Sequence, residues 1–187
     1  MNPLENKKIL IVGGSSGIGL ALAKQVYKFG ARVIIASRSA VEQHGMLAGA
    51  IGDGIETLSF NITSDCETKS LMDAVEQIDH LIITVRPEIK PAIFLMTTID
   101  DAKEAFENKF WGAYRLIQAA HNHINPGGSI VMTTGIAGEK IFRGSSTMGI
   151  INAAVETLCR FLAVELAPIR VNAVSPGFIE PKIEDIK

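Results

Sequence analysis

A glycine- and serine-rich turn near the start of the chain has the composition of a phosphate-binding loop. It runs Gly13-Gly14-Ser15-Ser16-Gly17-Ile18-Gly19, between an apolar segment typical of a strand and an amphipathic segment typical of a helix. Gly13 allows a tight turn, Gly17 lets a pyrophosphate approach the backbone, and Gly19 lets the helix pack closely on the sheet. Because a helix start offers free N–H groups and a positive dipole end, the turn predicts a dinucleotide site. The expected contacts are at Gly13, Ser15, Ser16, Gly17, Ile18 and Gly19.

Two residues after the second expected strand indicate which dinucleotide would bind. A site for NAD typically has a carboxylate here, which binds the ribose 2′-hydroxyl. This chain has Ser37 and Arg38 instead. A guanidinium pairs with a 2′-phosphate and gains nothing comparable from a hydroxyl, so the pair predicts NADP(H). The alternative is that Arg38 is a solvated surface residue.

Strands and helices alternate along the chain in the pattern of βαβ units. This pattern predicts an α/β fold with a doubly wound parallel sheet (Rossmann fold), in three α/β/α layers with strand order 3-2-1-4-5-6. Ligands bind such sheets beyond the carboxyl ends of the strands. The expected strands are 8–12, 32–36, 56–60, 80–84, 129–133 and 170–174, and the expected helices are 17–29, 64–77, 100–122 and 147–166, with 39–54 helical in places.

Composition excludes several classes of function. A chain of 187 residues suits one domain, and its 18 Lys+Arg against 20 Asp+Glu give a net charge of −2. That balance argues against nucleic acid or an anionic membrane as a partner. Two cysteines, and no His, Cys or carboxylate cluster with ligand spacing, argue against a metal site. No apolar run reaches the roughly 18 residues of a membrane span, so we expect a soluble cytoplasmic protein.

Taken together, these motifs resemble the short-chain dehydrogenase/reductase family. Residues 11–19 are similar to its cofactor loop, 127–131 to its fifth strand, and 158–177 to its following helix, sixth strand and Ser-Pro-Gly turn. The resemblance implies hydride transfer between NADP(H) and a small carbonyl compound or alcohol. It also implies cofactor contacts at Asn61, Ile62, Thr84, Val85, Asn152, Pro176, Gly177 and Ile179.

The catalytic residues of that family are replaced here. The family uses a Tyr-x-x-x-Lys pair with a serine and an asparagine. In this chain Met148 stands at the tyrosine position, Asn152 at the lysine position, Gly135 at the serine position and Lys109 at the asparagine position. A desolvated lysine can donate a proton, and a threonine hydroxyl can bond a carbonyl oxygen. Lys109 and Thr134 are therefore the candidate catalytic residues, with water as a third donor. The alternatives are a ligand-holding or solvated Lys109 and a structural Thr134.

Two functions stay open at this stage. One is an NADP(H)-dependent oxidoreductase with a non-standard proton donor, and the other is a non-catalytic NADP(H)-binding sensor or interaction module. Similar family members pair through two long helices, so the resemblance implies a homodimer or homotetramer through helices 100–122 and 147–166. Family members also continue past the Pro-Gly turn with a substrate lid, another helix and a seventh strand. We therefore expect a single domain over 1–187 that is shortened at its C-terminus.

Overall fold

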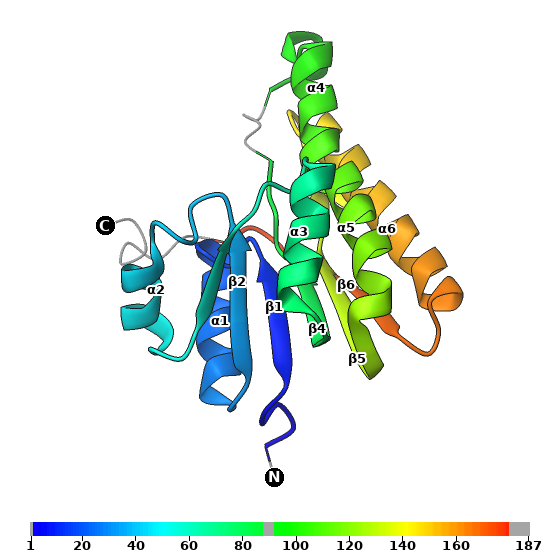
Figure 1. Ribbon diagram of the computed structural model, residues 1–187. Coiled ribbons are helices and arrows are strands. Elements are labelled where there is room, and N and C mark those ends of the chain that lie inside the picture. The colour runs from blue at the N-terminus through cyan, green and yellow to red at the C-terminus, as the bar shows by residue number, and fades with distance from the viewer. Residues whose placement is uncertain (1, 88–91, 180–187) are drawn as a thin grey trace.

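A single parallel sheet organises the chain, as the alternation of elements predicts. The computed structural model describes residues 2–87 and 92–179 (Figure 1). Its sheet has six strands in the order β3-β2-β1-β4-β5-β6. The predicted three-layer doubly wound sheet is therefore confirmed. The strands are β1 (Lys8–Val12), β2 (Arg32–Ser37), β3 (Glu56–Ser59), β4 (Ile78–Ile83), β5 (Ile124–Thr133) and β6 (Arg170–Val174).

Helices cover both faces of the sheet, and alternate residues of the strands point to opposite faces. In β1, Leu10 and Val12 belong to one buried apolar cluster, whereas Ile9 and Ile11 belong to a second. The first cluster includes residues of α3, α5 and α6, and the second includes residues of α1 and α2 (Figure 1). The helices are α1 (Gly17–Lys28), α2 (His44–Ile51), α3 (Asp65–Val75), α4 (Ile99–Phe106), α5 (Gly112–Ala120) and α6 (Ser146–Glu165).

The single helix expected over 100–122 is wrong in one respect, because a π-helical turn interrupts it. This turn, η2 (Glu107–Trp111), separates α4 from α5. The N–H of Gly112 bonds the carbonyl of Glu107, five residues earlier, in place of the α-helical partner four residues earlier. Lys109 lies in the middle of the turn and is buried. π-turns are frequent at functional sites, and nothing in the apolar periodicity announces this one.

Helix α6 corrects the expectation that no segment has the length of a membrane span. It has 20 residues, and an 18-residue stretch of it has a mean hydropathy of 1.4, which is enough to cross a membrane by length and composition only. Glu156 and Arg160 interrupt the apolar residues of this helix. In the fold, one stripe of α6 (Ile151, Val155 and Cys159) is buried against the core, while much of its remaining apolar surface is exposed.

Candidate functional site

The predicted site residues gather at the edge of the sheet where the strands end. All five pairings between neighbouring strands are parallel, so the carboxyl ends of all six strands meet at one edge. The glycine turn follows β1, Arg38 follows β2, Thr84 follows β4, and Thr134 follows β5. The topology thus brings the predicted nucleotide turn and the predicted catalytic residues to the same edge.

The glycine turn has the backbone that its sequence predicts. Gly13 has φ +85° and Gly17 has φ +51°, in the region that favours glycine. Nothing lies within 4 Å of the position that a Gly17 side chain would take, so a ligand can approach the backbone there. Ser16, the N-cap of α1, makes no capping bond with its side chain, and the first turn of α1 has no acidic residue. The positive end of α1 is therefore available to a phosphate group.

Gly19 holds α1 against the sheet. A Cβ on Gly19 would lie 2.3 Å from the carbonyl oxygen of Gly13 and 2.6 Å from Oγ1 of Thr84. The same Thr84 hydroxyl bonds the carbonyls of Val12 and Gly13, at 3.1 and 3.0 Å. Thr84 therefore holds the start of the glycine turn in place through these two hydrogen bonds.

We expect Gly19→Ala to lower the free energy of unfolding by about 1–3 kcal/mol, because the methyl group forces backbone atoms apart. The variant should also weaken dinucleotide binding, since the turn must open. Chemical denaturation measures the first effect and calorimetry the second. Gly49→Ala is the matched control: Gly49 lies in α2 with nothing within 4 Å, so its substitution should stabilise the chain by about 0.5–1 kcal/mol. Equal stability of the two variants would contradict this account of Gly19.

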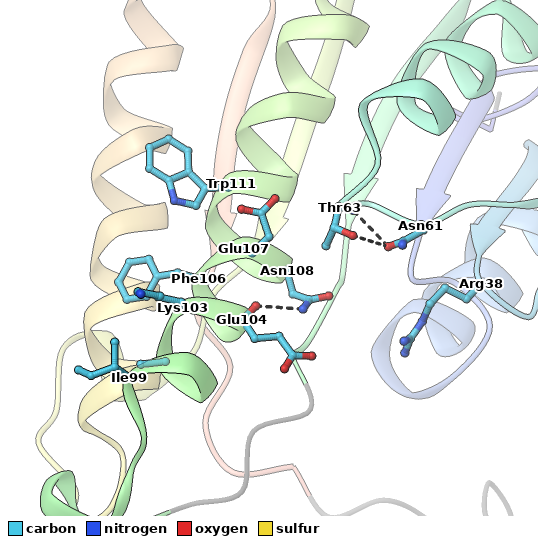
Figure 2. A pocket seen from close by; sticks show the side chains of 11 residues that line it. Arg38, Asn61, Thr63, Ile99, Lys103, Glu104, Phe106, Glu107, Asn108 and Trp111 are labelled. Carbon is cyan, nitrogen blue, oxygen red and sulfur yellow. Dashed lines mark hydrogen bonds between the residues drawn. The ribbon is translucent and has the colours of Figure 1, made fainter.

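Arg38 lines a cavity at the carboxyl edge of the sheet. The cavity has a volume of about 880 Å³ and is bounded on one side by Arg38, Asn61 and Thr63 (Figure 2). The other side is formed by α4 and η2, including Lys103, Glu104, Glu107, Asn108 and Trp111. Ser37 donates a hydrogen bond to Ser15 across 3.0 Å, which ties the end of β2 to the glycine turn.

The other predicted contact residues divide into buried and exposed groups. Ile62 is buried and would crowd any side chain at Gly112, because its Cγ1 lies 2.9 Å from the Cβ position of that glycine. Val85 is half-buried against the core. The Pro176 carbonyl accepts a hydrogen bond from the Ile136 N–H at 2.9 Å, and Gly177 and Ile179 are exposed.

Lys109 and Asn152 form a buried polar pair below this edge. Nζ of Lys109 donates to Oδ1 of Asn152 at 2.8 Å and to the carbonyl oxygen of Thr134 at 3.2 Å. The Asn152 amide in turn donates to the carbonyl of Gly135 at 3.2 Å. Lys109 is 6% exposed and Asn152 is 3% exposed. Residues 43 positions apart in the sequence thus meet as a single hydrogen-bonded unit.

The environment of Lys109 makes its ammonium group acidic. Burial, assisted by the positive charge of Arg86, lowers the pKa of Lys109 from 10.5 to about 8, against the opposing effect of Glu156. An amine with that pKa can hold a proton at neutral pH and release it to a reacting group. The structure therefore supplies the desolvated lysine that the sequence suggested.

The hydroxyl of Thr134, the second candidate catalytic residue, is hydrogen-bonded within the protein. Its Oγ1 donates to the carbonyl of Val174 at 3.2 Å, and its N–H bonds the same oxygen at 2.8 Å. The residue is buried, so the hydroxyl proton is used between β5 and β6. Thr134 contributes to the site through its carbonyl oxygen, which accepts from Lys109. Met148, at the tyrosine position of the resemblance, packs half-buried against the core.

Sequence reasoning missed two charged residues beside the site. Glu156 lies one helical turn after Asn152 on α6, and its buried Oε1 has no hydrogen-bond partner among the described residues. The four-residue spacing from Asn152 was the available signal. Arg115, on α5, bonds three different segments, and no sequence pattern indicated it.

Comparisons with known proteins agree with this arrangement. A family model described as enoyl-(acyl carrier protein) reductase matches residues 12–186. The chain is 32% identical to the short-chain dehydrogenase/reductase ATR9 of Stachybotrys chlorohalonatus, over 95% of this chain and 75% of that protein.

Solved structures are similar in fold. A small-chain dehydrogenase in complex with NADPH has a TM-score of 0.78 and 29% identity, over 94% of this chain and 72% of its own. A variant of ElxO with NADPH bound has a TM-score of 0.86 and 25% identity, over 94% of this chain and 75% of its own. Among the described residues, no group of three or more His, Cys, Asp or Glu side chains could hold a metal ion.

Proposed function

The chain belongs to the short-chain dehydrogenase/reductase family, and from that premise we propose that it is an NADP(H)-dependent oxidoreductase acting on a small carbonyl compound or alcohol. The observation that carries the proposal is the junction of the open glycine turn with Arg38 at the carboxyl edge of the sheet. The uncapped start of α1 and the bare space at Gly17 suit a pyrophosphate, and Arg38 suits a 2′-phosphate. Similar proteins with NADPH bound support the same cofactor.

When bound, NADPH supplies a hydride, and reduction of a carbonyl compound also needs a proton at the substrate oxygen. Lys109 is our candidate for the donor of this proton. Its ammonium is buried and has a pKa near 8. Asn152 and the Thr134 carbonyl hold it in place. An ammonium has three N–H groups, and these two contacts use two of them. The third can face a carbonyl oxygen.

Calorimetric titration with NADPH and then NADH, followed by turnover on a panel of carbonyl compounds and alcohols, tests the function. The proposal expects tight NADPH binding, weaker NADH binding and turnover of at least one substrate class. NADPH binding without any turnover would favour the alternative, a non-catalytic NADP(H)-binding sensor or interaction module, which the replacement of the usual tyrosine by Met148 motivates. Absence of binding to either dinucleotide would refute both.

The exposed apolar side chains of η2, α5 and α6 lead us to propose that copies of the chain associate through these elements. Trp111 is 48% exposed, Phe161 is 63% exposed and Val164 is 78% exposed. Helix α6 packs against α4 and η2, so these side chains lie on neighbouring elements. Apolar side chains exposed together on neighbouring elements are typical of an interaction site, and closed symmetric oligomers are the commonest way to cover them.

For the double variant Trp111→Lys/Phe161→Lys we expect a monomer, because two charges would be buried in the contact. Light scattering at micromolar concentration should show a mass near 20.1 kDa, against a dimer or tetramer for the unmodified chain. Ile141→Lys is the control: Ile141 is 100% exposed and lies outside these helices, so its substitution should leave the mass unchanged. A monodisperse monomer for the unmodified chain would contradict the proposed association.

A further inference from the structure

Arg115, in the middle of α5, makes polar contacts to three residues. Its NH2 donates to Oε1 of Glu107 at 2.8 Å, its NH1 donates to the carbonyl oxygen of Ile62 at 3.2 Å, and its Nε bonds Asp65. These partners belong to η2, to the turn after β3 and to the first turn of α3. The Arg115 side chain is 24% exposed, so solvent screens its charge only in part.

Of these partners, Glu107 lines the cavity that Arg38 lines, and Ile62 adjoins two residues that line it. Ile62 lies between Asn61 and Thr63, which form one wall, and Glu107 belongs to the other wall (Figure 2). The turn that carries Ile62 is itself ordered, because Oδ1 of Asn61 accepts from the Thr63 N–H at 3.2 Å and from its hydroxyl at 3.0 Å. Arg115 therefore joins this turn to η2 by hydrogen bonds.

The charge of Arg115 also bears on what the cavity can bind. Glu104 and Glu107 both line the cavity, on the wall that faces Arg38. The salt bridge from Arg115 pairs the Glu107 carboxylate. Without Arg115 that carboxylate would face the cavity unpaired and would repel a phosphate group.

We propose that Arg115 is a positioning residue for the adenosine end of the dinucleotide: it holds the Asn61–Thr63 wall against η2 and pairs the Glu107 carboxylate. The proposal rests on the proposed function, because it takes the Arg38 cavity as the adenosine site. Arg115 does not touch the ligand in this account. It acts through Ile62 and Glu107, so its loss affects the adenosine end and leaves the nicotinamide end unchanged.

Calorimetry with three probes on Arg115→Gln tests the proposal. The probes are NADPH, adenosine 2′,5′-bisphosphate for the adenosine end, and reduced nicotinamide mononucleotide for the other end. We expect the dissociation constants of the first two to rise about tenfold or more. The constant for the mononucleotide should change less than twofold. Arg115→Lys, which keeps the charge but loses the planar fork, should give intermediate values.

Arg160→Gln is the matched control, because Arg160 is exposed on α6 and its NH2 bonds Thr157 within the same helix. It should leave all three constants unchanged. Equal weakening of all three probes by Arg115→Gln, together with a lowered melting temperature, would show a merely structural role and overturn the proposal. Unchanged binding of adenosine 2′,5′-bisphosphate would also overturn it. An unmodified chain that binds none of the probes would remove the proposed function itself, and this inference with it.

Discussion

Lys109→Met lowers turnover by about 10²–10⁴-fold, the usual contribution of a general acid, while NADPH binding changes only a few-fold. Methionine has a similar length and no proton to donate, so the hydride would have to be transferred without protonation of the substrate oxygen. Single-turnover reduction followed at the NADPH absorbance measures the chemical step, and calorimetry measures binding.

Two further variants separate the proton from the charge. Lys109→Arg keeps a cation that does not deprotonate in proteins, so it should remain nearly as inactive as Lys109→Met. Lys69→Met removes an exposed lysine of α3 and should leave turnover unchanged. Full activity of Lys109→Met in a folded protein would exclude Lys109 as the donor and leave Thr134 and water as the remaining candidates.

The pH dependence follows from the same residue. Reduction of a carbonyl requires protonated Lys109, and its pKa is about 8, so the rate should fall as the pH rises through about 8. The lowered pKa also means that the unfolded chain binds more protons than the folded one between about pH 8 and 10.5. Stability should therefore rise with pH in that window. Comparing the unfolding free energy of the unmodified chain with that of Lys109→Met across the window isolates this contribution.

Arg38→Ala weakens NADPH binding by about 10–100-fold and leaves NADH binding nearly unchanged. The expected size is that of one or two hydrogen bonds between charged groups, about 1.5–3 kcal/mol. NADH has no 2′-phosphate, so it makes no such hydrogen bond with Arg38 that the substitution could remove. Titration of the variant with both dinucleotides measures the ratio, and Arg38→Asp should invert the preference by providing a ribose-binding carboxylate.

Arg32→Ala is the control for the Arg38 prediction. Arg32 is also exposed, but it begins β2 at the opposite edge of the sheet. Its substitution should not change the ratio of the two affinities. A similar loss of affinity for NADPH and NADH in Arg38→Ala would mean that Arg38 shapes the site but does not bind the 2′-phosphate.

The fold and the dinucleotide-binding part of the site, the glycine turn with Arg38, could be predicted from the sequence by itself. Both depend on local patterns. Runs of β-branched residues specify strands, and the glycine turn specifies a backbone that few other residues adopt. The carboxyl edge of a parallel sheet then brings that turn and Arg38 together, whatever their exact contacts. The sequence also indicated Lys109, although only by resemblance to a family whose catalytic residues this chain lacks.

Only the tertiary structure decided what those side chains contact. The π-turn at Glu107–Trp111 shifts the helix out of α-helical register, and apolar periodicity does not reveal such a turn. It leaves Lys109 buried against Asn152 and the Thr134 carbonyl, and with a pKa near 8. Local patterns show which face of an element is buried, but not which distant side chain it will meet there. The hydrogen bond between Lys109 and Asn152 and the contacts of Arg115 with Glu107 and Ile62 depend on how elements pack in the fold. They therefore become visible only once the chain is folded.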